Sequence, residues 1–392
     1  MPTQDIYFDH AATTPTAPEV VRAMEPWWTE QFGNPSSIYR LGQDARSAID
    51  LSRRRCATIL ACQPAEILFT SGATESNNQT LLNVLFRAKT AAPGTTPHLI
   101  TSAVEHHAVL HPAEWLQRNG FALTVLPVDS RGMVDPYDLR RAIRPSTVLI
   151  SLMYVNNEVG TIQPIRELAK IAREHGVPIH TDAVQAAGHL TLDVNDLGVD
   201  LLSLSAHKFY GPKAVGLLYV RKGAPLPHLQ LGGGQEGGRR GGTENVAGIV
   251  GLAAALQAAE QQREAYVEDC RQIRDALWKG IEERIGGAML NGPSIDGSER
   301  LTNNLSVAIE GVQGETALLS LDMLGVAASA GSACTTGNTQ PSHVLMAMGF
   351  SAERARSSLR FTSGRCNIPD DVDETVDALE ESVSRIRQLA AT

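Results

Sequence analysis

The sequence predicts an α/β protein: a large, mostly parallel sheet with helices on both faces, followed by a smaller α+β part. The first observation is an alternation of strand-like and helical segments, which is typical of parallel sheets. The second is size, because 392 residues with 43% hydrophobic content can fill a large core in about two to three domain units. The strand-like segments are seven: 66–70, 98–102, 123–128, 148–154, 177–182, 201–205 and 215–220.

The segments between and after these strands have helical length or helical spacing of apolar residues. The stretch GGGQEGGRRGGTENV, residues 232–246, is too rich in glycine for regular structure. We expect a large domain over 16–260 and a small domain formed by 1–15 and 261–392, the latter with a strand at 305–309. The predicted helices are 19–31, 43–60, one from about residue 74, 109–119, 136–143, 164–175, 246–279, 315–324 and 370–389.

Charge and hydropathy exclude two classes of partner. A formal net charge of −9 gives no general attraction to polyanions, so we expect no nucleic acid partner. The N-terminus lacks a basic segment followed by an apolar one, and the longest apolar run, 246–256, is too short to span a bilayer. We therefore expect a soluble cytoplasmic protein with no membrane partner.

The five cysteines are odd in number and widely spaced, and no C-x-x-C pair suggests a zinc or redox site. We expect no metal site and mostly plain thiols. Cys334 differs because it lies in SAGSACTTGNTQP, a composition typical of a loop. A thiol in such a loop is either incidental or chemically active.

Polar residues follow four of the predicted strands, at 105–106, 156–158, 182–185 and 205–208. Ligands of parallel sheets bind at the carboxyl ends of the strands. Lys208 lies at one of these ends, where a desolvated amine can lose its proton and attack a carbonyl. A solvated loop lysine is the alternative on this stretch alone.

Residues 71–75, SGATE, follow a strand and open a helix. The free N–H groups near Ala73 and Thr74, the positive end of the helix dipole and the Thr74 hydroxyl make this turn a candidate phosphate site. Helix capping alone would also explain such a turn.

Pyridoxal phosphate requires an amine for its aldehyde, a carboxylate for its pyridine nitrogen, a flat group over its ring and anchors for its phosphate. Each residue taken singly could be a cap or a surface polar group, but the set together predicts this cofactor. The assignments are Lys208 as Schiff-base amine, Asp182 as partner of the ring nitrogen, His106 as stacking group, Thr74, Ser205 and His207 as phosphate contacts, and Asn157 and Gln185 as partners of the ring hydroxyl.

Nine segments spread over nearly the whole chain form a distinctive set: FDHAATTP, FGNPSSI, FTSGATESNN, VEHHAV, NNEVGTIQP, HTDAVQAAG, SAHKFYGPK, GGGQE and SAGSACTT. With them the chain resembles the cysteine desulfurases, pyridoxal-phosphate enzymes of the class V aminotransferase fold. The resemblance implies a PLP-dependent transferase fold of the type I aminotransferase kind. It also implies conversion of L-cysteine to L-alanine, with the sulfur moved to Cys334 as a persulfide.

The resemblance further implies a homodimer in which Thr243 binds the phosphate of the neighbouring subunit's cofactor. It places Asn34, Asn157 and Arg360 on the substrate, and a planar guanidinium suits a carboxylate. His106 is an expected general acid or base. The long SAGSACTT form is similar to the nitrogenase and housekeeping iron–sulfur branch, so an iron–sulfur scaffold or another sulfur-acceptor protein is the expected partner.

Four positions depart from the family pattern, Tyr39, Ala214, Gly237 and Gly241, and none is an expected cofactor ligand. They concern mainly the 232–243 loop and its partner contacts. Cys366, six residues past Arg360, is a rival to Cys334 as the reactive thiol.

An aminotransferase or selenocysteine lyase of the same fold is the alternative enzyme, although the Cys334 loop argues against plain transamination. A sulfur carrier without turnover is the non-enzymatic alternative. The presence together of Thr74, Asp182, Lys208 and Cys334 argues against it.

Overall fold

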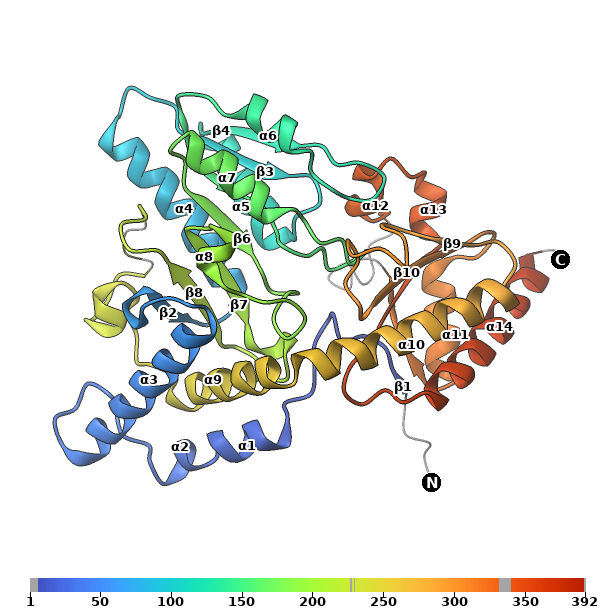
Figure 1. Cartoon of the computed structure of the whole chain (residues 1–392), viewed down its shortest axis with the longest axis horizontal. Coiled ribbons are helices and arrows are strands. Elements are labelled where there is room, and N and C mark those ends of the chain that lie inside the picture. Colours follow the sequence, from blue (N-terminus) through green and yellow to red (C-terminus); the bar gives the residue numbers. More distant parts are fainter. Residues whose placement is uncertain (1–5, 226–227, 229, 331–339, 391–392) are drawn as a thin grey trace.

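The computed structural model describes residues 6–225, 228, 230–330 and 340–390. The predicted thiol Cys334 lies outside these described residues. The chain forms two lobes connected by the long helix α10 (Arg263–Arg284), as Figure 1 shows.

A seven-stranded sheet forms the larger lobe, in the order β2-β8-β7-β6-β5-β3-β4. All neighbours from β7 to β4 are parallel, whereas β8 is antiparallel to both β2 and β7. The predicted mostly parallel sheet is therefore confirmed. The strands are β2 (Ile67–Thr70), β3 (His98–Ser102), β4 (Ala122–Leu126), β5 (Thr147–Ser151), β6 (Ile179–Asp182), β7 (Leu201–Ser205) and β8 (Gly216–Val220).

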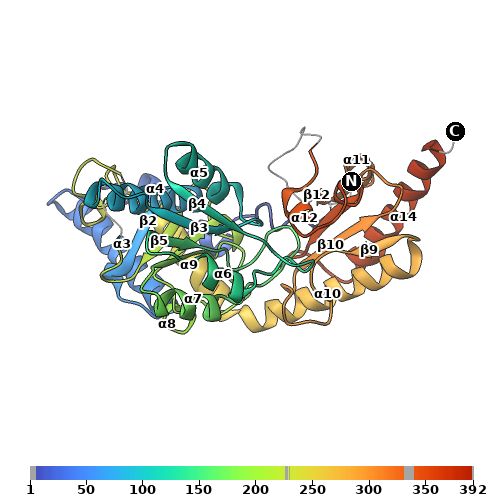
Figure 2. The ribbon, with the colours of Figure 1, turned by 90° about the horizontal axis from the view of Figure 1, so that it is seen from above.

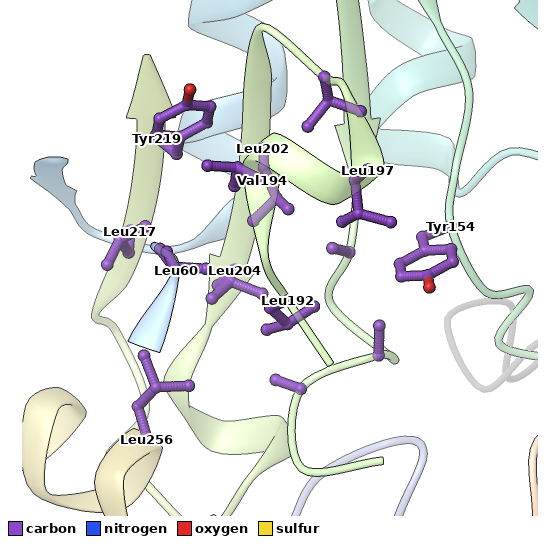
Figure 3. Close-up of a cluster of buried hydrophobic side chains, with 14 of the residues drawn as sticks. Leu60, Tyr154, Leu192, Val194, Leu197, Leu202, Leu204, Leu217, Tyr219 and Leu256 are labelled. Atoms are coloured by element: carbon purple, nitrogen blue, oxygen red, sulfur yellow. The ribbon is translucent and has the colours of Figure 1, made fainter. Parts of the chain in front are cut away.

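Both faces of this sheet are buried because alternate side chains meet helices on opposite sides. Leu201 and Leu218 pack in one cluster with α4 (Ala73–Ala91) and α5 (His107–Arg118). Their neighbours Leu202 and Leu217 pack on the other face, part of which is drawn in Figure 3. Figure 2 shows α4 and α5 on one side of the sheet and α7 and α8 on the other. The helices of this second face are α3 (Arg40–Ile59), α6 (Pro136–Ala142), α7 (Ile165–Glu174), α8 (Val194–Leu197) and α9 (Val246–Gln261).

The smaller lobe contains a four-stranded antiparallel sheet of order β12-β13-β10-β9. Its core includes Phe8, Leu277, Leu359 and Leu379, which come from all parts of this lobe. The elements are β9 (Ala288–Leu290), β10 (Asn304–Ile309), α11 (Gly314–Met323), β12 (Ser329–Ala330), α12 (His343–Ala347), α13 (Ala352–Arg356), β13 (Ser358–Thr362) and α14 (Asp370–Ala390).

The N-terminal strand β1 (Ile6–Tyr7) belongs to the smaller lobe, where it pairs in parallel with β11 (Val326–Ala327). The chain then crosses to the larger lobe, and Thr14 N donates to the His207 carbonyl at 2.9 Å. We propose the domain division 16–260 against 1–15 plus 261–392 on this basis.

The segment predicted as one helix over 19–31 is two helices, α1 (Pro18–Met24) and α2 (Pro26–Thr29). Pro26 has no N–H to donate and occupies the first turn of α2, where proline is tolerated. The helix predicted over 246–279 is likewise two helices, α9 and α10.

The glycine-rich loop contains a tight turn, Gln235–Gly238, in which Glu236 and Gly237 have left-handed rather than helical backbone angles. Glu236 is buried in it, with φ 50°, and forms an ion pair with Arg53 at 2.6 Å. A Cβ at position 241 would lie 2.6 Å from Gly232 Cα, so this path of the loop requires glycine there. Ala214 has φ 59°, a left-handed conformation that costs a non-glycine residue about 1–2 kcal/mol.

Across the residues that the structure describes, no helix is both long enough and apolar enough to cross a membrane.

The smaller lobe should depend strongly on Leu359, which is 0% exposed in its core. We expect Leu359→Ala to lower the free energy of unfolding by about 2–5 kcal/mol, because it leaves a cavity. Leu319→Ala on α11 is the matched control, since that side chain is 69% exposed. Chemical denaturation should separate the two variants; equal loss in both would contradict the assigned core.

Candidate cofactor and substrate site

A cavity of about 600 Å³ lies where the carboxyl ends of β6 and β7 meet the N-terminal turn and the smaller lobe. Ten of the residues that the sequence predicts for the site line this one cavity. They are Ala73, Thr74, His106, Asn157, Asp182, Gln185, Ser205, His207, Lys208 and Arg360.

Two predicted residues lie outside the lining. Asn34 is on the exposed segment between α2 and α3, where its side chain accepts from Ser36 N at 2.9 Å. Thr243 is exposed and lines a smaller cavity of about 150 Å³ that also includes Ser71. The contacts predicted for Asn34 and Thr243 stay predictions.

Lys208 lies at the end of a short 3₁₀ turn, Ala206–Lys208, directly after β7. Its ammonium nitrogen donates to the carbonyls of Ala11 at 2.5 Å and Ala12 at 2.7 Å. Gln185 Nε2 also donates to the Ala11 carbonyl, at 3.0 Å. The N-terminal turn therefore fixes the amine at the cavity wall.

Asp182 ends β6 and is 7% exposed. One carboxylate oxygen accepts from Asn77 Nδ2 at 2.7 Å, and the other accepts from Val184 N at 3.1 Å. Asn77 is fully buried on α4. No local feature of the sequence marks Asn77, because it is one of several amide residues within a predicted helix. These two bonds orient the carboxylate toward the cavity that it lines.

His106 is the N-cap of α5, and its Nδ1 accepts from Ala108 N at 3.0 Å. The neutral ring therefore carries its proton on Nε2. Burial lowers the pKa of His106; the nearby positive charge of Lys208 acts in the same direction, and Asp182 opposes it. A neutral, flat ring at the cavity suits the predicted stacking role.

The start of α4 offers the predicted phosphate site. Gly72, its N-cap, has φ 149°, and a Cβ there would project into the space facing the Ser205 hydroxyl, 3.9 Å away. The first N–H groups of a helix lack partners within the helix, so those near Ala73 and Thr74 can receive an anion. Burial lowers the pKa of His207 to about 4, so its ring is neutral. Together with the amine and the carboxylate, these groups fit pyridoxal phosphate.

Arg360 enters the cavity from β13 and is 1% exposed. Its Nη2 pairs with Asp9 Oδ1 at 2.8 Å, and its Nη1 donates to the Asn157 carbonyl at 2.8 Å. Burial raises the pKa of Asp9, while the charge of Arg360 opposes that rise. Asp9 is thus a second residue that the sequence analysis does not assign.

Glu158 is buried at the cavity and accepts a hydrogen bond from the Ser342 hydroxyl. Burial raises its pKa. The next residue, His343, also lines the cavity, and its Nε2 lies 3.0 Å from the Glu105 carbonyl oxygen. These contacts connect the start of α12 to the larger lobe.

The rival thiol, Cys366, is exposed and does not line the cavity. Its sulfur lies 3.3 Å from His10 Nε2, and burial of part of the residue raises the pKa of the thiol. Cys56, Cys62 and Cys270 are also free thiols.

Residues 6–374 match the family described as Aminotransferase class-V. A protein named cysteine desulfurase IscS from Dictyoglomus turgidum is 48% identical over 387 residues, which cover 99% of this chain and 96% of that protein. A solved NifS-like protein superimposes with a TM-score of 0.90 at 35% identity, covering 97% of this chain and 100% of the other. The structure described as SspA in complex with cysteine gives a TM-score of 0.81 at 37% identity, covering 93% and 100%.

Glu105 is a buried carboxyl whose protonation should make the stability of the fold depend on pH. It is 1% exposed; one oxygen accepts from the Ser102 hydroxyl at 2.6 Å and from Met153 N at 2.9 Å. The other oxygen has no partner within the described residues. Burial raises the pKa of this carboxyl from 4.5 to about 8.

The folded chain therefore keeps this proton between about pH 4.5 and 8, where the unfolded chain has lost it. The stabilising contribution is complete below pH 4.5 and is lost as pH rises toward 8, by at most about 1.4 kcal/mol per pH unit. Glu105→Gln cannot titrate. We compare the free energies of unfolding of Glu105→Gln and of the unmodified protein, both without cofactor. Because only the unmodified protein loses this contribution as pH rises, the variant should be more stable relative to it at pH 8 than at pH 5. Denaturant titrations at both pH values, with the exposed Glu282→Gln as control, should show this; a difference independent of pH would contradict it.

Proposed function

This chain belongs to the class-V aminotransferase family and is a cysteine desulfurase, and we propose that Lys208 and Cys334 carry its conversion of L-cysteine to L-alanine. The observation that supports the assignment most directly is the convergence of Lys208, Asp182, His106 and Arg360 on one cavity. These side chains come from both lobes and from segments far apart in the sequence.

We propose pyridoxal 5′-phosphate as the cofactor. When bound, it supplies an electron sink for charge that develops at the substrate Cα. Thr74, Ser205, His207 and the start of α4 would bind its phosphate, with Thr243 contributed by a second subunit. Asp182 would face the pyridine nitrogen, His106 the ring, and Gln185 and Asn157 the ring hydroxyl.

Arg360 would bind the substrate carboxylate, because a buried guanidinium gives a charge-assisted, directional contact. The contacts of its two terminal nitrogens with Asp9 and the Asn157 carbonyl fix its plane. Asn34 is a further proposed substrate contact. Lys208 would remove the proton from Cα, and the Ala11 and Ala12 carbonyls can stabilise the ammonium that results.

Sulfur transfer is assigned to Cys334. Its thiolate sulfur would attack the substrate sulfur, forming an S–S bond while the Cβ–S bond breaks. The electron pair of that bond remains on Cβ, which takes a proton and becomes the alanine methyl group. His106 Nε2–H or Lys208 can supply that proton.

The described residues on either side of the Cys334 segment support this assignment. Ser329 pairs with Arg360 in the β12–β13 ladder, and Ser342 donates to Glu158 at the cavity. The chain thus leaves the described part and re-enters it beside the proposed substrate anchor. Cys366 has no such relation to the cavity.

We propose a homodimer that delivers sulfur to an iron–sulfur scaffold or another acceptor protein in the cytoplasm. Large apolar side chains are exposed on the segment between α2 and α3 and in the glycine-rich region before Thr243: Phe32 at 67%, Ile38 at 89% and Leu231 at 85%. Apolar surface of this kind marks an interaction site when it is contiguous. Arg46 of α3 pairs with Glu244 at 2.8 Å, which connects this region to the residue after Thr243.

Lys208→Ala should abolish release of alanine and sulfide from L-cysteine, with a loss of at least about a thousandfold, because both the amine and the base are removed. The reductant-containing assay should leave Lys222→Ala, an exposed lysine outside the cavity, near normal. Borohydride should attach cofactor to the Lys208 peptide only in the unmodified protein. Steady turnover by Lys208→Ala would remove this residue from its role.

Cys334→Ser should retain cofactor and bind L-cysteine yet release no sulfide, because serine is a far weaker nucleophile toward sulfur. Cys366→Ser should remain active. Mass spectrometry after brief exposure to L-cysteine should find the added sulfur on the Cys334 peptide. Added sulfur on the Cys366 peptide, or an active Cys334→Ser variant, would falsify the assignment.

A further inference from the structure

A second cavity, of about 530 Å³, lies between the two lobes, and among the described residues it shares none of its lining with the candidate cofactor site. Helix α10 and residues 295–302 form its wall on the smaller lobe, and residues 189–190 form its wall on the larger lobe. We refer to it as the seam cavity.

Three arginines line the seam cavity: Arg271, Arg274 and Arg300. Arg300 is 2% exposed, and the bonds of its guanidinium within the described chain go to backbone carbonyls, including Pro293 O at 2.9 Å and Val159 O at 3.1 Å. Carbonyl oxygens solvate a guanidinium but do not neutralise its charge. Burial, with the nearby charge of Arg274, lowers the pKa of Arg300 to about 9.

Acidic groups compensate this charge only in part. Arg274 is 4% exposed and pairs with Asp275 at 2.6 Å, so that carboxylate is already engaged. Asp296 is the other acidic residue of the lining, and it is exposed. Arg271 pairs with Glu268 at 2.7 Å, but both side chains are about half exposed. An exposed ion pair of this kind contributes little to stability, so Arg271 can leave Glu268 for another anion at small cost in free energy.

Unsatisfied polar atoms point to a missing partner. His189 is 8% exposed and lines the seam cavity, and its Nδ1 has no hydrogen-bond partner within the described residues. The hydroxyl of Thr302, also in the lining, likewise has no hydrogen-bond partner within the described residues. Buried polar groups in folded proteins almost always have a partner. Both groups can donate a hydrogen bond to an acceptor in the cavity.

We propose that the seam cavity binds a small organic anion through a carboxylate or phosphate group. The Arg271 guanidinium would turn from Glu268 toward the anion, while Arg274 and Arg300 supply the positive potential behind it. His189 and Thr302 would donate the remaining hydrogen bonds. Apolar side chains in the lining, such as Leu190 and Val267, can contact an apolar body, so the ligand is organic rather than inorganic.

The site would bridge both lobes, because His189 belongs to the larger one and Arg271 to α10. A ligand that binds only the folded chain stabilises it by mass action. The proposal does not depend on the chemistry at Lys208.

The test uses the holoenzyme, in which cofactor occupies the phosphate site at α4. Isothermal titration calorimetry at constant ionic strength would measure three probes: phenyl phosphate, benzoate and inorganic phosphate. We expect one saturable site per chain for phenyl phosphate or benzoate, and weaker binding of inorganic phosphate. The first two probes distinguish a phosphate from a carboxylate as the preferred group.

Arg271→Gln should raise the dissociation constant about tenfold or more, as expected for loss of a charge-assisted bond. Lys279→Gln is the matched control: it removes the same charge from an exposed part of α10 outside the seam cavity. It should leave binding within about twofold. Asp296→Asn should tighten binding, because it removes an opposing charge.

Arg271 is half exposed, so its replacement should not affect folding, which thermal melting without probe would verify. Three results would overturn the proposal. The first is that no probe shows saturable binding, and the second is that Lys279→Gln and Arg271→Gln weaken binding equally. The third is a change in the cofactor's visible absorbance that tracks binding, which would place the probe at the active site.

Discussion

The candidate site depends on the N-terminal turn at residues 9–14, which lies between the lobes. The carbonyls of Ala11 and Ala12 accept from Lys208, while Asp9 pairs with Arg360. One short segment therefore positions the proposed amine of the larger lobe and the proposed carboxylate anchor of the smaller one. Strand β1, which precedes the turn, pairs with β11 of the smaller lobe. The position of the Lys208 amine is therefore coupled to the position of the smaller lobe.

The strand ends could be predicted from the sequence, whereas contacts between residues far apart in the chain could not. Apolar alternation and helical spacing are local properties, so they place β6 and β7, with Asp182 and Lys208 at their ends. Parallel topology then brings those ends together. The partners of these residues are set by tertiary packing: nothing local connects Asn77 to Asp182, 105 residues away, or Asp9 to Arg360, 351 residues away. Short elements such as β9 and β12 were missed because two or three residues carry no period.

Burial governs the charge of the site. Burial lowers the pKa of His10, within the N-terminal turn, and of His207, which contacts it, to about 4, so both rings are neutral. Burial also lowers the pKa of His106. The formal charges at the cavity then reside chiefly on the amine, the guanidinium and the carboxylates, which are the groups that a zwitterionic amino acid and an anionic cofactor need. Neutral imidazoles donate and accept hydrogen bonds there without repelling Lys208.

The two lobes carry the two proposed roles, the base and the sulfur carrier, and these roles place different demands on the chain. The proposed base, Lys208, must act on one proton and so benefits from a fixed position, which two carbonyls and the strand that precedes it provide. A sulfur carrier must instead meet the substrate and later an acceptor protein, so it cannot be part of a sheet. Cys366 is tied to His10 beside the β13 strand end. The described residues that flank the Cys334 segment instead contact residues that line the cavity, Ser329 by pairing with Arg360 and Ser342 by donating to Glu158. This difference supports the proposal that Cys334 is the carrier.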